Sequence, residues 1–334
     1  MRIRQFVLAA VVALTPGVAL GASYSEIVAF GDSLSDAGNA SIATLGAEPG
    51  PGYATRSVPL VPFPVGYFTN PQVGSGPAGL WVDQLAALLG VTDPQPALAP
   101  LGGTNYAVGS ATTSGTVSMN TEVGLFLTGG AAPSTALYTL WGGANDIFDG
   151  MNPVSAADTI ANQILALHAA GANDFLWLNL PLLGQTPRLS GDATLSSAAN
   201  AASLAFDAEW ASRLAFLQTL GINVTGLNVE ALFAQILANP AAFGFSNVTS
   251  ACMSTPGCNP NTFLYWDMEH PTTYADSLVA RAAFDALNPS AVPEPPSLVL
   301  MGMGGIFLIA AGVGRRCRRE RAVVASPARA HGSQ

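Results

Sequence analysis

The sequence predicts an α/β fold in which a parallel β-sheet of about five strands is covered by helices on both faces. Two observations support this prediction: short apolar runs alternate with longer segments of helical periodicity, and most of these segments end at or near glycine. The expected strands are residues 27–30, 105–108, 135–141, 174–180 and 222–227. The expected helices are residues 81–89, 156–170, 194–220, 229–238 and 274–286.

A Gly-Asp-Ser turn follows the first expected strand. Residues 27–30 are four consecutive apolar residues, as in a buried strand of a parallel sheet. Gly31 lets the chain turn sharply there, since it has no Cβ. Ser33 would then lie beyond the carboxyl end of the strand, where open α/β sheets bind ligands. A serine in this place is a candidate nucleophile, provided that a base and an oxyanion site lie nearby.

Three later stretches at strand ends can supply these partners: residues 102–111, 141–146 and 267–270. The first is rich in glycine, whose N–H can approach an oxyanion without obstruction by a side chain. The second contains Asn145, whose amide can donate a second hydrogen bond to the oxyanion. The third contains His270, which can take the serine proton.

His270 is the one histidine suited to act as the base. His168 falls within a helical pattern, and His331 lies in the terminal tail. Asp267 precedes His270 by three residues and can orient the imidazole and stabilise its charged form. Three other carboxylates remain alternatives for this role: Asp146, Glu269 and Asp276.

Residues 49–77 are rich in glycine and proline and are expected to form a long irregular loop over the sheet. Loops of this length are often functional. The loop carries four aromatic residues: Tyr53, Phe63, Tyr67 and Phe68. These rings either line an apolar substrate groove or pack the loop onto the body, and the sequence favours neither.

The blocks Gly31-Asp32-Ser33-Leu34, Gly143-Ala144-Asn145-Asp146 and Asp267-Met268-Glu269-His270, in this order and spacing, resemble the GDSL/SGNH family of hydrolases. Residues 179–184 also resemble a segment of the secreted, lecithinase-like branch. The resemblance covers about residues 27–286. It implies a flavodoxin-like three-layer α/β/α sandwich, the SGNH hydrolase fold, and hydrolysis of carboxylic esters.

The resemblance also implies the roles of individual residues. Ser33 is the expected nucleophile, His270 the base and Asp267 its partner. The expected oxyanion hole consists of the Ser33 N–H, the Gly109 N–H and the Asn145 side chain. Gly109 is followed by Ser110 where many relatives have two glycines, so two nearby glycines remain alternatives: Gly102 and Gly103.

The composition argues against a nucleic-acid or metal-dependent function. Residues 23–290 contain 4 arginines, no lysine and 19 acidic residues, a formal charge of −15. Such a surface repels phosphates. Asp32 and Asp36 are not accompanied by a ligand cluster, so we expect no metal and no cofactor, and Asp32 to bond to the backbone of its turn.

The N-terminus and the cysteines indicate export. Residues 1–22, with two arginines, an apolar run and small residues, are typical of a signal peptide, and an N-terminal membrane anchor is the alternative. The hydrolase domain is expected over residues 23–290. Cys252 and Cys258 are expected to form a small disulfide loop, with metal binding as the alternative.

The C-terminal segment, residues 291–321, contains a Pro-rich linker, an expected transmembrane helix at 297–314 and an arginine cluster. This layout resembles the PEP-CTERM sorting signal. The resemblance implies recognition by an exosortase, transient anchoring in the inner membrane and delivery to the cell surface or exterior. An ordinary C-terminal anchor is the alternative, and residues 322–334 are expected to be a disordered tail.

The sequence therefore predicts an exported serine esterase or lipase that acts on an acyl ester, a lipid or an acetylated sugar. A carbohydrate O-deacetylase acting on surface polysaccharide is a second reading of the same site. A catalytically silent surface-matrix protein is a third, and the presence of Ser33, Asn145, Asp267 and His270 argues against it.

Overall fold

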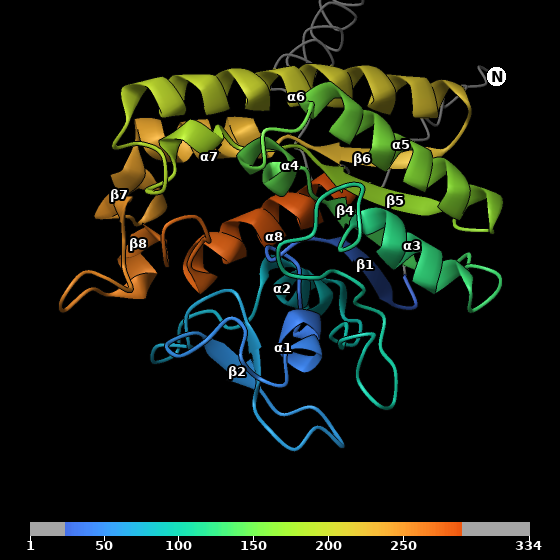
Figure 1. Cartoon of the computed structure of the whole chain (residues 1–334), viewed down its shortest axis with the longest axis horizontal. Coiled ribbons are helices and arrows are strands. Elements are labelled where there is room, and N and C mark those ends of the chain that lie inside the picture. The colour runs from blue at the N-terminus through green and yellow to red at the C-terminus, as the bar shows by residue number, and fades with distance from the viewer. Residues whose placement is uncertain (1–23, 289–334) are drawn as a thin grey trace, which may run out of the picture. The chain divides into compact units, whose positions relative to one another are not determined.

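Four parallel strands form the central sheet, in the spatial order β1-β4-β5-β6 (Figure 1). The computed structural model describes residues 24–288. The expected signal peptide, sorting segment and tail lie outside the described residues. The sheet strands are β1 (Ile27–Gly31), β4 (Leu137–Trp141), β5 (Asp174–Leu178) and β6 (Asn223–Leu227).

Helices cover both faces of this sheet, which confirms the predicted α/β architecture (Figure 1). On one side α5 packs against α6 and α3, and on the other α2 packs against α8. These helices are α2 (Trp81–Leu89), α3 (Met119–Leu127), α5 (Pro153–Ala169), α6 (Ala193–Thr219) and α8 (Thr273–Leu287). The shorter helices are α1 (Asn39–Ala43), α4 (Ala144–Phe148) and α7 (Val229–Ala238).

The core lies between the sheet and these helix layers. The strand β4 is buried along its whole length, and Trp81 of α2 packs edge-on against Trp141 at its end, with ring centroids 5.6 Å apart. Each long helix begins at a side-chain cap: Asn152 accepts from two N–H groups of α5, and Asp192 from two of α6. None of the helices in the described part of the chain has the length and apolar character needed to cross a bilayer.

The expected fifth strand, residues 105–108, is not a regular strand. This segment runs along β1 at the edge of the sheet: Tyr106 N donates to Ala29 O at 2.7 Å and Val108 N to Gly31 O at 3.2 Å. Only Asn105 forms a bridge with β1, so the sheet has four regular strands rather than five. The segment nevertheless carries the following turn to the carboxyl end of β1.

The expected irregular loop at 49–77 contains a short antiparallel ribbon. Its strands are β2 (Ala54–Arg56) and β3 (Val65–Tyr67). A second small pair, β7 (Asn247–Ala251) and β8 (Phe263–Tyr265), also lies outside the central sheet. Three 3₁₀ turns complete the described elements: η1 (Leu183–Gln185), η2 (Pro240–Phe243) and η3 (Pro260–Thr262).

Candidate functional site

Ser33, His270 and Asp267 form one hydrogen-bonded chain. The distance from Ser33 Oγ to His270 Nε2 is 2.8 Å, although the two residues are 237 positions apart in the sequence. His270 Nδ1 lies 2.7 Å from Asp267 Oδ2. When the neutral imidazole carries its proton on Nδ1, the Nδ1–H group donates to the Asp267 carboxylate. Nε2 then accepts a hydrogen bond from the Ser33 hydroxyl. This is the arrangement of a nucleophile, a base and an orienting acid.

Two tight turns hold this chain of residues in place. Ser33 follows β1, where Gly31 lies so close to β4 that a Cβ would come within 2.2 Å of Trp141 O. Asp267 and His270 lie between β8 and α8, in a turn closed by the hydrogen bond from Trp266 N to His270 O at 2.8 Å. The second oxygen of Asp267 accepts from the N–H groups of Glu269 and His270 at 2.8 and 2.7 Å. The Asp267 carboxylate therefore also stabilises the turn on which His270 lies.

The environment shifts the pKa of both members of the Asp267–His270 pair. Burial alone would raise the pKa of Asp267, but the hydrogen bond and charge of His270 outweigh it and lower that pKa. Burial would lower the pKa of His270, but the hydrogen bond and charge of Asp267 outweigh it and raise that pKa above its ordinary value of 6.5. The carboxylate thus stays ionised wherever the imidazole titrates.

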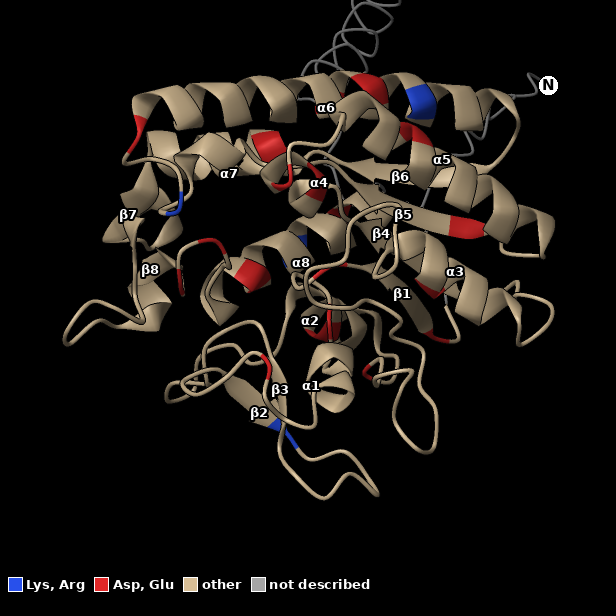
Figure 2. Ribbon diagram, viewed as in Figure 1, with Lys and Arg blue, Asp and Glu red and all other residues tan. Residues whose placement is uncertain are grey.

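Other charged groups surround the imidazole. Burial raises the pKa of Asp32, which precedes the serine, to about 7. Its Oδ1 accepts from Leu34 N at 3.0 Å, the backbone bond that was expected for it. Glu269 forms an ion pair with Arg188 from the loop before α6. The four arginines of the hydrolase domain are scattered among many acidic side chains (Figure 2).

Asn145 lies in α4, directly after β4, and lines the same pocket as Ser33 and His270. Strands β1 and β4 pair with Gly31 opposite Trp141, so the residues that follow each strand meet at one edge of the sheet. Asn145 Nδ2 donates to Ala111 O at 2.9 Å. An amide nitrogen has two hydrogens, so one N–H of Asn145 is not used in this bond.

The structure gives the Gly109 N–H a partner other than an oxyanion. It donates to Asp36 Oδ2 at 2.7 Å, because the buried Asp36 carboxylate collects backbone donors and also caps the start of α1. Glycine is needed at 109 because a Cβ would come within 2.6 Å of the Phe68 ring. The alternatives Gly102 and Gly103 lie beside the middle of β1, since Thr104 O accepts from Ala29 N, and not at its carboxyl end.

The neighbouring Ser110 has a left-handed backbone, with φ of 63°, and its side chain is exposed. Among the described residues no acceptor is bonded to its N–H, and the same holds for the N–H of Ser33. Val108 pairs with Gly31, so the turn at 109–111 begins beside the Ser33 turn. Two backbone donors are therefore available at this edge of the sheet.

Two aromatic residues of the 49–77 segment contact the pair Asp267–His270. Both were expected either to line a substrate groove or to pack the loop onto the body, and a contact with this pair was not predicted. The hydroxyl of Tyr53 donates to Asp267 Oδ2 at 2.5 Å. The ring centroid of Phe68 lies 5.2 Å from that of His270. No local pattern identifies these contacts, because both come from a segment about 200 residues away in sequence.

Much of the lining of the pocket beside Ser33 is apolar. Its volume is about 40 Å³, and its apolar lining includes Leu34, Phe148, Leu180, Leu183 and Phe233. Across residues 24–288 no group of three or more His, Cys, Asp or Glu side chains is arranged to hold a metal ion. Cys252 and Cys258 are joined by a disulfide, with their Cα atoms 5.5 Å apart.

Comparison with protein families gives two matches on this chain. Residues 27–283 match the model of the GDSL-like Lipase/Acylhydrolase family, and residues 291–319 match the PEP-CTERM protein-sorting motif. The first match includes Ser33, Gly109, Asn145, Asp267 and His270.

Curated relatives include bacterial enzymes. Esterase EstA of Pseudomonas aeruginosa is 29% identical over 323 residues, which cover 79% of this chain and 47% of that protein. Thermolabile hemolysin of Vibrio parahaemolyticus is 24% identical over 295 residues, which cover 79% of this chain and 64% of that protein. The chain thus spans about half the length of the first of these relatives and under two thirds of the second.

Among solved structures, a member of the lipolytic protein G-D-S-L family from Veillonella parvula superposes with a TM-score of 0.41 at 15% identity. The superposition covers 78% of this chain and 96% of that one.

Proposed function

Since this chain belongs to the GDSL-like lipase/acylhydrolase family, we propose that it is a serine hydrolase of carboxylic esters with Ser33 as nucleophile. The observation that carries the proposal is the hydrogen-bonded chain from Ser33 through His270 to Asp267. No other arrangement is required to activate a serine hydroxyl at neutral pH.

The first half of the reaction forms an acyl-enzyme. Ser33 Oγ attacks the ester carbonyl carbon while His270 Nε2 takes the hydroxyl proton. Asp267 stabilises the imidazolium that results. The tetrahedral intermediate then collapses, the bond to the leaving oxygen breaks, and Nε2 delivers its proton to the departing alcohol. In the second half water repeats these steps on the acyl-enzyme, which releases the carboxylic acid and restores Ser33.

We infer an oxyanion hole made of the N–H of Ser33, the N–H of Ser110 and the side-chain amide of Asn145. Ser110 replaces the expected Gly109, whose N–H is bound to Asp36. The left-handed φ of Ser110 is a strained conformation for a residue with a side chain, and such strain is common at functional turns. Its unpaired N–H supports the assignment.

The size of the pocket favours short acyl groups. A volume of about 40 Å³ has room for about three water molecules, so a short acyl group fits this space and a long fatty chain does not. This supports the second candidate function, removal of O-acetyl groups from carbohydrate. A panel of acetyl, butyryl and octanoyl p-nitrophenyl esters, with acetylated sugar and phospholipid, separates the two.

The PEP-CTERM motif at 291–319 supports export, with an exosortase acting on the C-terminal segment and delivery to the cell surface or exterior. Pulse-chase labelling should then show that the segment from about residue 291 onward is removed after secretion. Retention of the full length at the inner membrane would contradict it.

The test of the proposed chemistry is Ser33→Ala. We expect kcat on p-nitrophenyl acetate to fall by on the order of 10⁶-fold, as for removal of a serine nucleophile in other enzymes. A fluorophosphonate probe should label the natural chain and not the variant.

Ser25→Ala is the matched control, because Ser25 lies just before β1 at the opposite end and contacts Thr135. It should keep full activity and labelling. If Ser33→Ala hydrolysed esters at the natural rate, Ser33 would not be the nucleophile.

A further inference from the structure

The carboxylate of Asp267 has a second side-chain partner that is not part of the proposed reaction. Asp267 Oδ2 accepts from His270 Nδ1 at 2.7 Å and from the Tyr53 hydroxyl at 2.5 Å. Both donors act on the same oxygen. Any change in the bond from Tyr53 therefore changes how much negative charge this oxygen presents to the imidazole.

Tyr53 is held against the site by the ribbon that follows it. Ala54 pairs with Tyr67 across β2 and β3, and Ala54 N donates to Thr69 O at 2.9 Å. Thr69 Oγ1 then donates to Pro271 O at 3.1 Å, next to His270. The ribbon and the turn that carries the base are thus one hydrogen-bonded unit.

A continuation of this unit fixes the start of α8. Asn70 Oδ1 accepts from Thr273 N at 2.8 Å, and Asn70 Nδ2 donates to Thr273 Oγ1 at 3.1 Å. The Phe68 ring lies between the two partners: its centroid is 6.2 Å from that of Tyr53 and 5.2 Å from that of His270. The Phe68 ring thus packs against both the Tyr53 ring and the His270 ring.

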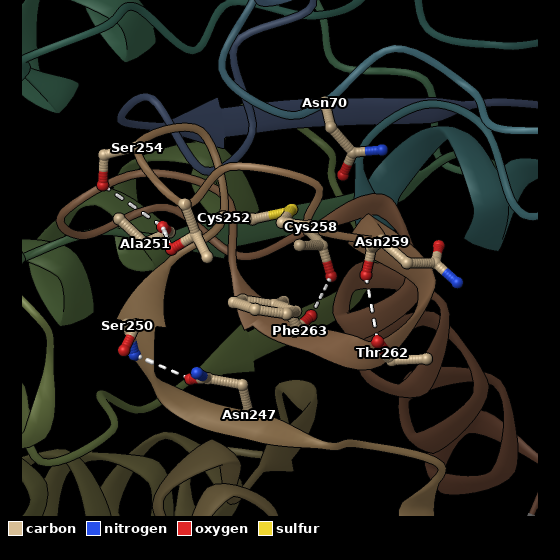
Figure 3. The surroundings of a disulfide bond; sticks show 12 residues. Asn70, Asn247, Ser250, Ala251, Cys252, Ser254, Cys258, Asn259, Thr262 and Phe263 are labelled. Atoms are coloured by element: carbon tan, nitrogen blue, oxygen red, sulfur yellow. Dashed lines mark hydrogen bonds between the residues drawn. A yellow bond between two sulfur atoms is a disulfide. The ribbon is translucent and has the colours of Figure 1, made fainter.

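The disulfide loop packs against the residue that precedes Tyr53. The preceding Gly52 approaches Met253 so closely that a Cβ would come within 2.7 Å of the Met253 Cε. Met253 follows Cys252, which is bonded to Cys258 (Figure 3). Cys252 N and Met253 N donate to Tyr265 O and Trp266 O, so the loop is also joined to the strand that leads to Asp267.

We propose that Tyr53 is a positioning residue of the esterase site, which holds the Asp267 carboxylate and weakens its pull on the His270 imidazolium. The inference rests on the proposed function, in which His270 must be neutral to take the serine proton. By sharing the carboxylate, the Tyr53 hydroxyl keeps more of the imidazole neutral near pH 7.

The groups that face His270 fix the expected sign. Asp267 and Glu269 lie on its own turn, Asp32 lies on the turn after β1, and Tyr53 reaches it through Asp267. Arg188 is paired with Glu269. All three carboxylates favour the imidazolium, so removal of the Tyr53 donor leaves Asp267 free to favour it further. The His270 pKa should then rise.

The experiment compares Tyr53→Phe with the full-length natural chain. The acidic limb of the kcat/KM profile on p-nitrophenyl acetate should move up by about half to one pH unit, a typical effect of one hydrogen bond on a neighbouring charge. At pH 7 kcat should fall by up to about three- to tenfold, the limits that a shift of half to one unit sets on the neutral imidazole. KM should change little, since the ground-state contacts of the substrate are kept. NMR titration of His270 should give the same upward shift.

Tyr274→Phe is the matched control. It also removes one tyrosine hydroxyl that donates a hydrogen bond, to Phe243 O at 3.0 Å, but away from Asp267. Its pH profile should equal that of the natural chain. A Tyr53→Phe variant that kept both the natural limb and the natural His270 titration would overturn the proposal.

Failure of the proposed esterase function can be distinguished from failure of the inference about Tyr53. If the natural chain hydrolysed no ester, the proposed function would fail, and the NMR titration would still test the link between Tyr53 and His270. If the natural chain were active and Ser33→Ala inactive, an unchanged His270 pKa in Tyr53→Phe would contradict the inference about Tyr53 and leave the proposed function standing.

Discussion

The side chain of Asn145 must serve two acceptors at once during the proposed reaction. One hydrogen of its amide is already donated to Ala111 O at 2.9 Å. That bond fixes the orientation of the amide plane without a substrate present. The second hydrogen is then held ready for a charge that develops only in the transition state, which is where a donor accelerates a reaction most.

Asn145→Ala should therefore lower kcat on p-nitrophenyl acetate by about 10²–10³-fold with a small change in KM. The steady-state parameters and the melting temperature of the variant should be measured together. Asn145→Asp, which keeps the size but places a negative charge beside the oxyanion, should be at least as slow. An Asn145→Ala enzyme with natural kcat would remove the amide from the mechanism.

The blocks that contain Ser33 and Asn145 could be recognised in the sequence because each follows an expected strand, and in the structure these strands, β1 and β4, pair with each other. The Gly109 assignment could not be settled in this way, because it depends on which N–H groups donate to the buried Asp36 carboxylate. Tyr53 was expected only to line a groove or to pack its loop. Its hydrogen bond to Asp267 could not be predicted, because the two residues are 214 positions apart.

The short helix α4 separates the pocket beside Ser33 from a second apolar hollow. That hollow has a volume of about 230 Å³ and lies against α6, with Leu189, Leu195, Ala198, Ala199 and Ala202 in its lining. Phe148, at the end of α4, lines both spaces. The Arg188 guanidinium covers its ring at 4.1 Å from the centroid. The Phe148 ring therefore lies between the two spaces.

Phe148→Ala should join the two spaces and change the chain-length preference. The natural enzyme should prefer acetyl and butyryl esters. In the variant the ratio of kcat/KM for octanoyl over acetyl ester should rise about tenfold or more, because each buried methylene contributes about 0.8 kcal/mol. The measurement is the full series of p-nitrophenyl esters.

Leu195→Ala is the control for this variant, since Leu195 lines only the second hollow and is exposed. It should leave the preference as it is. An unchanged series in Phe148→Ala would mean that the acyl chain leaves the pocket by another route.

Among the secondary-structure elements, helices with a strong apolar periodicity were predicted well. Elements with a weak or interrupted pattern were missed. The helices expected at 81–89 and 229–238 have these bounds in the structure. The helix α3 was missed, although Ser118 caps it, because Gly124 and threonine interrupt its apolar pattern. The ribbon β2–β3 was missed because its short strands are stabilised by contacts with the body and carry little pattern of their own.

Across the fold of residues 24–288, buried carboxyl groups outnumber the arginines. Burial raises the pKa of Asp32 and of Asp207 to about 7. Burial also raises the pKa of three other acids: Asp36, Glu122 and Asp276. A group whose pKa is higher in the fold than in the unfolded chain stabilises the fold while it is protonated. That contribution is complete below about pH 4 and is lost as the pH rises through the folded pKa.

The melting temperature should therefore fall as the pH is raised from about 5 to 8. The raised pKa of His270 acts in the same direction, since its contribution is also lost as the pH rises. The measurement is thermal unfolding by circular dichroism at constant ionic strength. A maximum of stability at pH 8 or above would contradict the expectation.

Asp207→Asn is the variant that tests one contributor. Asp207 lies in α6, accepts from Leu180 N at 3.1 Å and is not part of the proposed chemistry. Its replacement should flatten the fall in melting temperature between pH 5 and 8 and leave the activity profile unchanged.

The order of the reacting groups along the polypeptide has a consequence for the life of the protein before it is folded. Ser33 lies just after the first strand of the domain, whereas His270 lies just before its last helix. A ribosome or a translocation channel that handles the chain from its N-terminus releases Ser33 long before His270. Under the proposed mechanism a nascent or threaded chain therefore has no activated serine, and reactivity arises only with completion of the domain.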